Sequence, residues 1–391
     1  LLETLQRNSL GMSIGCLYVG SPTCADDVLL ISDNHLELQA MLDVSYTYSK
    51  CHQYDLHPQK SSVTNIVKSN RMEIEKKWRI GASPVPHQER FTHLGIVWTT
   101  GSKAPDISEN IIKARRTAYS LIRVGLHGND GLGPVTCMKI IQTYVVPRLL
   151  HGAEAMVLGS GEVQLLESFY RKMLRQIQNL PDNTSSAGIY LLIGTYPIEA
   201  QYHIRALNLF GSLCRLHKTH ILHQLAMRQL SVKNKYSWFT MISSLGGKYD
   251  LDVHKQVLFP WRKEAWKRLV KTTVKSYWHM KLCEEAKSRT SLKWLVLPEC
   301  QNSGPHSLWI ASKRKPALLE PSATRARMLV GRFRTQKNLA SFYPKKYTAS
   351  CLLCSGTHEE DLLHMLVNCE AGYGKTSKIK DQLLDVYINS G

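Results

Sequence analysis

The sequence predicts an α+β protein: a small unit of strands and one helix, then a long, mainly helical region, then a small cysteine-rich module. Three observations support this prediction. Apolar residues alternate with a period of two near the start of the chain, as in strands with one buried face. From about residue 108 they recur every three or four residues, as in amphipathic helices. Near the end, three of the ten cysteines cluster around a histidine.

The first strands carry a pair of adjacent acidic residues. Residues 11–32 are expected to form a β-hairpin, with a turn at Gly20-Ser21-Pro22 and an apolar second strand over 28–31. This prediction places Asp26 and Asp27 at the turn side of the second strand. Two neighbouring carboxylates at a tight strand turn can bind hard cations such as Mg²⁺.

The remaining elements follow from periodicity and from Gly and Pro positions. A helix over 35–54 and short strands over 63–66 and 91–99 complete the first unit, which spans 1–100. A helical region over 101–230 follows, in which Ser108 is the expected cap of the first helix. Its other expected helices lie at 134–144 and 162–180 and as a pair within 187–230, joined near Gly194.

The second half of the chain divides by composition. Residues 231–340 are expected to be a basic, Trp-rich helical connector, which is less regular over 231–260 and contains a linker over 298–305. Residues 341–391 are expected to be the small terminal module. The net charge of +19 is concentrated here, because 261–346 contains 20 Lys and Arg against 5 Asp and Glu. An excess of this size predicts a polyanionic partner, RNA or DNA before an acidic membrane surface.

The cysteine cluster has the spacing of metal ligands. Cys351 and Cys354 form a Cys-x-x-Cys turn, and His364 and Cys369 follow within 15 residues. This pattern predicts a four-coordinate structural zinc site, with His358 as the rival to His364. The bland alternative is three unrelated thiols beside a core histidine. The other seven cysteines are scattered singly and are expected to be reduced.

The front of the chain resembles the reverse transcriptases of non-LTR (LINE-type) retrotransposons. Ala-Asp-Asp-Val-Leu-Leu at 25–30 is similar to the family's polymerase motif. Four further segments follow in the family's order: Leu-Glu-Leu-Gln at 36–39, His-Pro-Gln-Lys-Ser-Ser-Val at 57–63, Phe-Thr-His-Leu-Gly-Ile at 91–96, and a thumb-like region that includes 114–116 and 144–152. The terminal cluster resembles the Cys-Cys-His-Cys segment that follows the polymerase in many of these proteins.

The resemblance implies a role for individual residues. Asp26 and Asp27 would be catalytic Mg²⁺ ligands, and Lys60 would contact a deoxynucleotide or a phosphate. It also implies that 1–100 is part of a polymerase palm, that 101–230 is a thumb, and that 341–391 is a zinc knuckle. Nucleic-acid contacts are further expected from the basic residues Arg115, Arg116, Lys267, Arg268, Arg325, Arg327, Arg332 and Arg334.

The sequence departs from the family pattern in ways that bear on activity. Cys24 stands where the family has an aromatic residue, and His57 stands where it has Asn. Only 25 residues precede Asp26, so the family's first catalytic aspartate and its fingers are expected to be missing. The first residue, Leu1, also hints at a fragment. We therefore expect no polymerase activity from this chain alone.

Two functions remain open from the sequence. The first is a fragment of an RNA-directed DNA polymerase that retains nucleic-acid binding. The alternative is a non-enzymatic, zinc-dependent RNA- or DNA-binding protein derived from a retroelement. In both cases the partners are nucleic acids, with no membrane partner and no small substrate beyond a deoxynucleotide. The expected location is intracellular, as a ribonucleoprotein in the nucleus or cytoplasm.

Overall fold

The computed structural model describes most of the chain, in two compact units. The described residues are 1–65, 77–100, 106–128, 131–232, 234, 237–300, 304–354, 358–369 and 371. Unit 1 comprises Leu1–Arg115, Val146–Leu165 and Gln201–Val274, and unit 2 comprises Arg116–Val145, Leu166–Ala200 and Lys275–Gly391. Each unit is therefore built from three separate stretches of the chain. The expected division into four consecutive domains stays a prediction.

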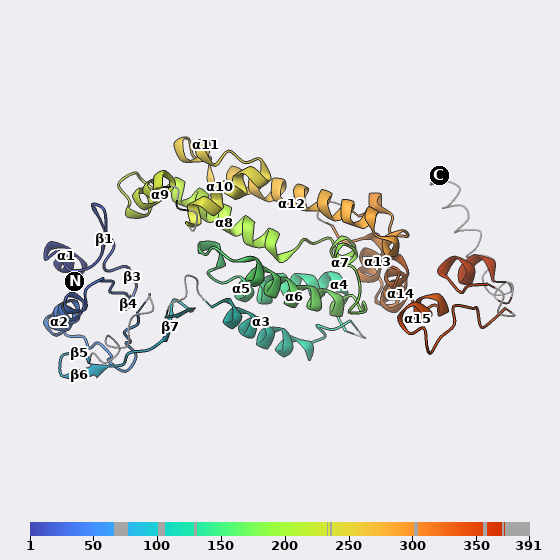
Figure 1. The fold of residues 1–391 in the computed structure, drawn as a ribbon, viewed down its shortest axis with the longest axis horizontal. Helices are drawn as coiled ribbons and strands as arrows, with labels where there is room; N and C mark the ends of the chain where they lie inside the picture. Colours follow the sequence, from blue (N-terminus) through green and yellow to red (C-terminus); the bar gives the residue numbers. More distant parts are fainter. Residues whose placement is uncertain are drawn as a thin grey trace. The chain divides into compact units, whose positions relative to one another are not determined.

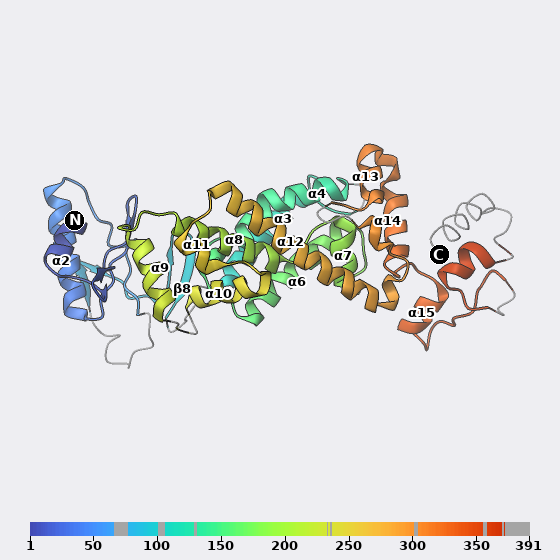
Figure 2. The same cartoon turned by 90° about the horizontal axis from the view of Figure 1, so that it is seen from above.

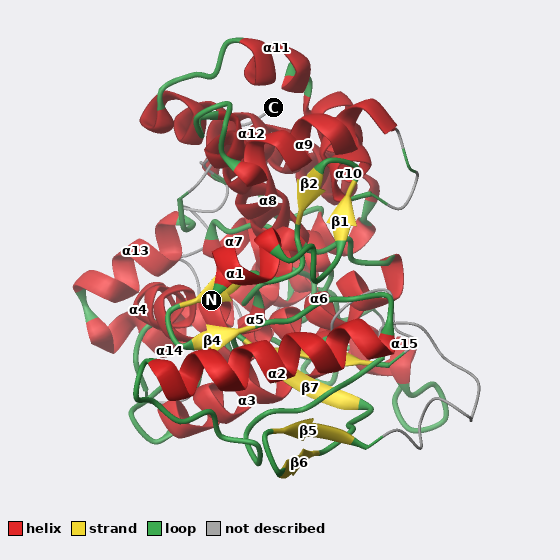
Figure 3. Ribbon diagram, turned by 90° about the vertical axis from the view of Figure 1, so that its left-hand side faces the viewer, coloured by secondary structure: helices red, strands yellow, loops and turns green. Residues whose placement is uncertain are grey.

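The expected α+β class is confirmed. In the described part of the chain, the strands form four separate two-stranded antiparallel sheets within the first 100 residues, and helices dominate the rest (Figures 1 and 3). The strands are β1 Ser13–Ile14, β2 Leu17–Tyr18, β3 Thr23–Cys24, β4 Asp27–Val28, β5 Trp78–Ile80, β6 Ser83–Val85, β7 Arg90–His93 and β8 Ile96–Thr99.

The hairpin expected over 11–32 is wrong in its turn. The chain makes two short hairpins instead. Strands β1 and β2 pair around Gly15, and β3 and β4 pair around Ala25, which has a positive φ of +55°. Gly20 is not a turn residue: its carbonyl accepts the N–H of Ile31 at 2.7 Å, and a Cβ there would lie 2.7 Å from the Cα of Gly11. Glycine serves at this position for close backbone approach.

A small apolar core joins helix α2 to strands β5 and β6. Helix α1 is Leu2–Arg7, and the expected helix over 35–54 is α2, His35–Cys51, capped by the side chain of Asn34. The Gln39 side-chain amide bonds the backbone N–H and C=O of Arg79 at 3.2 and 3.0 Å, which attaches β5 to α2. The core residues beneath are Leu42, Val63, Trp78, Ile80 and Val85.

The single strand expected over 91–99 is a hairpin. Strands β7 and β8 pair across Leu94 and Gly95, which both have positive φ (+50° and +77°), the requirement of a two-residue hairpin turn. The strand expected over 63–66 is a single bridge between Val63 and His87; residue 66 lies outside the described residues.

The helical region agrees with the expected helices except in two stretches. Where a pair of helices was expected within 187–230, the chain forms three, Ser186–Ile193, Ile198–Cys214 and Ile221–Val232. Within 231–260, where we expected less regular chain, Trp238–Tyr249 and Val253–Leu258 are helices. Asp106, not Ser108, caps the first helix, because its carboxylate accepts the Ser108 N–H at 2.9 Å. The α-helices are α3 Ile107–Ile122, α4 Pro134–Ile140, α5 Val146–Leu149, α6 Ser160–Ile177, α7 Ser186–Ile193, α8 Ile198–Cys214, α9 Ile221–Val232, α10 Trp238–Tyr249, α11 Val253–Leu258, α12 Lys263–Ser288, α13 Ser307–Arg314, α14 Leu319–Leu329 and α15 Gln336–Phe342.

Shorter helical turns connect these helices. Two are π-helical, Ile141–Val145 between α4 and α5 and His364–Asn368 near the end of the described chain. The 3₁₀ turns are Ala153–Ala155, Thr290–Leu292, Leu297–Glu299 and Pro316–Leu318.

In unit 1, one tryptophan of the basic connector is a core residue. Trp266 of α12 is 2% exposed, and its indole N–H donates to the carbonyl of Leu207 in α8 at 2.8 Å. Gly211 makes room for the ring, because a Cβ there would lie 2.3 Å from it. The Trp266 ring is therefore unavailable to a ligand.

In unit 2, a buried glutamine ties three segments together. The Gln178 side-chain N–H groups donate to the carbonyls of Leu174 and Ile189, each at 3.1 Å. Its carbonyl oxygen accepts the indole N–H of Trp309 at 3.1 Å. Trp309 lies on α13, which packs side by side with α14 (Figure 2). The interaction positions α13 and α14, from which the chain continues to α15 and the cysteine cluster.

Candidate metal centre and basic surface

Two backbone features bring the four predicted ligands together. An antiparallel bridge pairs Ser350 with Glu359, and the N–H of Cys351 donates to the carbonyl of His358 at 2.9 Å. The π turn then closes with the N–H of Cys369 on the carbonyl of His364 at 2.7 Å. Since a π turn joins residues five apart, it returns Cys369 to the side of His364.

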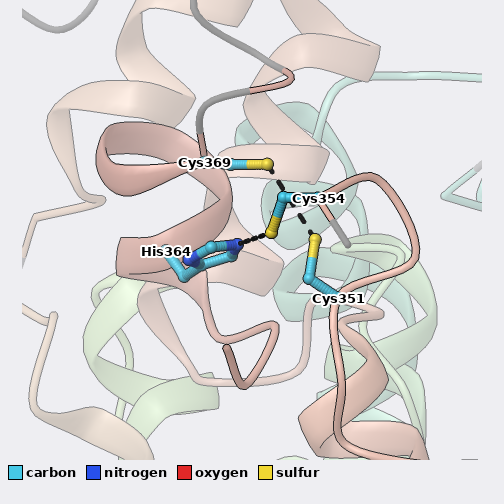
Figure 4. Close-up of side chains that lie close together, drawn as sticks. All are labelled: Cys351, Cys354, His364 and Cys369. Carbon is cyan, nitrogen blue, oxygen red and sulfur yellow. Dashed lines mark hydrogen bonds between the residues drawn. The ribbon is translucent and has the colours of Figure 1, made fainter. Parts of the chain in front are cut away.

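The ligand atoms form a compact set. The Sγ, Sγ, Nε2 and Sγ atoms of Cys351, Cys354, His364 and Cys369 all lie within 4.8 Å of one another. Figure 4 shows the four side chains pointing toward one another, with Cys351 Sγ 3.9 Å from Cys369 Sγ and Cys354 Sγ 3.2 Å from His364 Nε2. Tetrahedral zinc with usual bond lengths would need separations of about 3.8 Å between sulfurs and about 3.5 Å between sulfur and nitrogen.

The donor set suits a closed metal site. Three thiolates and one imidazole fill a tetrahedral coordination shell without leaving a position for substrate. Cys351, His364 and Cys369 are 3–7% exposed, so these three side chains are shielded from water, while Cys354 is partly exposed. The cluster can therefore hold a metal ion such as zinc. Of the residues that the structure describes, no other group of three or more Cys, His, Asp or Glu side chains converges in this way.

Local hydrogen bonds differentiate the thiols. Burial raises the pKa of Cys351, but the backbone N–H groups of Cys354 and Leu353 point to its sulfur, and these contacts lower the pKa overall. The pKa of Cys354 is raised by burial and by its two neighbouring thiols. Of these two thiols, Cys351 therefore more readily supplies the thiolate that a metal requires.

His358, the alternative to His364, does not belong to the group of side chains that converge in this structure. Its ring is exposed and lies 5.6 Å from the ring of His364, centroid to centroid. Its backbone carbonyl, rather than its ring, supports the site by accepting the Cys351 N–H. Asp361, which the sequence pattern did not indicate, accepts the backbone N–H of His364 at 2.8 Å and so fixes the start of the π turn.

The cluster is attached to α15, a connection the sequence did not indicate. Glu360 accepts the N–H of Gln336 at 3.0 Å through its side chain and that of Lys337 at 3.2 Å through its carbonyl. The Lys337 ammonium forms an ion pair with Glu359. These contacts hold the metal cluster next to the basic segment that precedes it.

The predicted nucleic-acid residues fall into two groups. Most are exposed and available to a polyanion: Lys60, Arg115, Arg116, Lys267, Arg268, Arg325 and Arg334. Two are partly buried and support the fold. The Arg327 Nε donates to the carbonyl of Asn179 at 2.9 Å, and the Arg332 guanidinium lies 5.4 Å from the ring centroid of Phe342. Burial also lowers the pKa of Arg332.

The paired aspartates lie at the tip of the β3–β4 hairpin. Asp26 is in the turn, Asp27 begins β4 opposite Cys24, and both are exposed. The structure does not bring them into any convergent group of three metal-binding side chains among the described residues. As they stand, the two carboxylates form an open pair at a surface turn.

No protein-family model and no curated protein matches the chain. No helix in the described ranges combines the length and apolar character that crossing a membrane requires.

Proposed function

We propose that this protein binds RNA or DNA through a zinc-ordered C-terminal module and the exposed cations that precede it. The observation that carries the proposal is the convergence of Cys351, Cys354, His364 and Cys369 within 4.8 Å. A structural zinc contributes on the order of 10–16 kcal/mol to the folding of small peptide modules near neutral pH. Zinc would thereby fix the segment that links the cluster to α15.

Charge supports a nucleic acid as the partner. Arg325 and Arg334 are exposed close before the cluster in sequence, and Lys267 and Arg268 are exposed on α12. The stretch 261–346 carries an excess of 15 positive charges, and such an excess attracts phosphates and releases their counterions. The buried positions of Trp266, Trp278 and Trp309 confine nucleic-acid contact along this stretch to the other side chains.

We propose a reverse-transcriptase lineage of the non-LTR type as the origin of this architecture. The order of the five motif segments supports it, and so does the position of Asp26 and Asp27 at the tip of a hairpin. A two-metal polymerase site needs further ligands to hold both Mg²⁺ ions. Because no third acidic ligand joins this pair among the described residues, the chain alone is proposed to lack Mg²⁺-dependent primer extension.

The salt dependence of binding tests the proposal. The purified full-length chain is titrated onto a fluorescein-labelled 20-nucleotide RNA at several KCl concentrations. We expect log K to fall linearly with log[KCl] with a slope of roughly −3 or steeper, equivalent to about four phosphate contacts on a single strand. Weak binding that does not respond to salt would contradict the proposal. A parallel primer-extension assay with Mg²⁺ and deoxynucleotides tests the polymerase statement, and any extension product would overturn it.

A further inference from the structure

The connection between α11 and α12 in unit 1 exposes large apolar side chains. Leu258 and Phe259 are each 71% exposed, Trp261 is 45% exposed, and Pro260 between the two rings is also exposed. By contrast, Trp266 one turn into α12 is buried. Aromatic rings left in water at this density require an explanation, since exposed apolar clusters commonly mark binding sites.

The backbone that carries these rings is held in place. The N–H of Phe259 donates to the carbonyl of Lys255 at 2.8 Å and ends α11. The N–H of Trp261 donates to the side-chain oxygen of Gln256 at 3.0 Å, and Gln256 is only 1% exposed. A buried side chain therefore anchors the turn from beneath while the two rings face solvent. Such pre-ordering lowers the entropy cost of binding.

Cations surround the rings in sequence and along the helix that follows. Arg262 and Lys263 come directly after Trp261, and Lys263, Lys267 and Lys271 are all exposed at intervals of four residues. Residues four apart lie on one face of a helix, about 6 Å apart along its axis. The acidic exception within 262–271 is Glu264. A ligand with a row of negative charges would therefore complement this surface.

We infer that Phe259 and Trp261 form a stacking platform for unpaired bases, with Arg262, Lys263 and Lys267 holding the phosphates of the same strand. The inference rests on the proposed function and specifies its ligand class: single-stranded RNA or DNA in preference to duplex. In a duplex the faces of the bases are covered by their neighbours, whereas in a single strand they are free to stack on exposed rings. The base of a nucleotide then stacks on the rings, and its phosphate pairs with the cations beside them.

Affinity for single and double strands tests the inference. The double variant Phe259→Ser/Trp261→Ser is compared with the full-length protein on a labelled 20-nucleotide oligo(U) and on a duplex of the same length. We expect the single-strand affinity to fall roughly tenfold or more, because each stacked base contributes a factor of that order. Duplex affinity and the salt slope should stay within twofold of the unmodified protein.

Two further variants separate rings from charge. Met280→Ser removes a 60% exposed apolar side chain from the same helix α12 and should leave single-strand affinity unchanged. Arg262→Gln/Lys263→Gln should reduce the salt slope by about 1.4, or about 0.7 for each lost phosphate contact. Trp261→Phe should remove most of the tryptophan quenching that oligo(U) causes.

The outcomes distinguish this inference from the proposed function. Salt-sensitive RNA binding that is unaffected by Phe259→Ser/Trp261→Ser would overturn the platform and leave the proposed function intact. Absence of binding by the unmodified chain to RNA and to DNA of the same length would overturn both. Loss of binding to anionic phospholipid vesicles in the double variant, with oligo(U) affinity unchanged, would show that the rings face a membrane and would also overturn the inference.

Discussion

The Sγ atoms of Cys351 and Cys369 lie 3.9 Å apart, although 18 residues separate them in the chain. Their proximity results from two backbone features, the bridge between Ser350 and Glu359 and the π turn that ends at Cys369. Both cysteines are buried, and no disulfide joins them. A buried thiol pair at this separation, completed by Cys354 and His364, is the arrangement expected of a structural zinc site.

Of the arginines that precede the cluster, we expect the exposed ones to contribute to RNA binding and Arg327 to contribute to the stability of the fold. Arg325→Gln and Arg334→Gln remove exposed cations, so we expect each to reduce the salt slope of RNA binding by about 0.7 without changing the thermal midpoint. Arg327→Gln should instead lower stability by about 1–2 kcal/mol, because it removes the bond to the Asn179 carbonyl. Thermal unfolding and anisotropy titrations measure both effects. A lower midpoint for Arg325→Gln would contradict this assignment.

Replacing Gln178 should destabilise unit 2. Gln178→Leu leaves the Trp309 indole N–H and the carbonyls of Leu174 and Ile189 without the bonds that Gln178 supplies. Each buried polar group that loses its partner costs about 1–3 kcal/mol, so we expect these three groups together to cost roughly 3 kcal/mol or more in urea unfolding. Gln39→Leu in unit 1 is the matched control, because the bonds of Gln39 are exposed and its replacement should cost less than about 1 kcal/mol.

Glu167 should make unit 2 less stable as pH rises. Burial raises the pKa of Glu167 to about 7, although the N–H of Ile198 donates to it at 2.8 Å. The folded state therefore favours the protonated carboxyl, and its contribution is present below the unfolded pKa near 4.5 and is lost as pH rises through 7. Relative to Glu167→Gln, the unmodified protein should lose roughly 3 kcal/mol between about pH 4.5 and pH 8. A difference independent of pH would contradict this account.

His203 should make unit 1 less stable as pH falls, the opposite of the effect of Glu167 in unit 2. Burial lowers the pKa of His203 to about 3, and its Nδ1 lies 2.7 Å from the Tyr249 hydroxyl. The folded state favours the neutral ring, so its contribution is present above pH 6.5 and is lost as pH falls toward 3. Compared with His203→Gln, the unmodified protein should lose about 2–3 kcal/mol between about pH 6.5 and pH 4.5. Urea unfolding at both pH values measures this, and equal losses in the two proteins would refute it.

The sequence predicted those parts of the fold that depend on residues close together in the chain. Helix α2 and the buried stripe of α6 followed from apolar spacing, and the Cys-x-x-Cys pattern identified the four side chains that converge. The α+β class followed from the same periodicities. These features depend on neighbours close in the chain, which is why the sequence alone was sufficient.

The failures share a physical cause. Gly20 was assigned to a turn, but it is required by its contact with Gly11, which the sequence around it does not encode. Leu94 adopts a left-handed conformation that bulky residues rarely take, so the β7–β8 turn was not expected. Tertiary contacts decided each of these cases.

The measurement that tests the central claim most directly combines metal content with RNA affinity for Cys351→Ser in the full-length chain. Cys16→Ser, at an exposed cysteine far from the cluster in sequence, is the control. We predict one zinc per chain in the unmodified protein and in Cys16→Ser, and none in Cys351→Ser, together with a loss of RNA affinity of tenfold or more. Zinc-free unmodified protein, or RNA affinity equal in all three proteins, would contradict a zinc-ordered nucleic-acid-binding module.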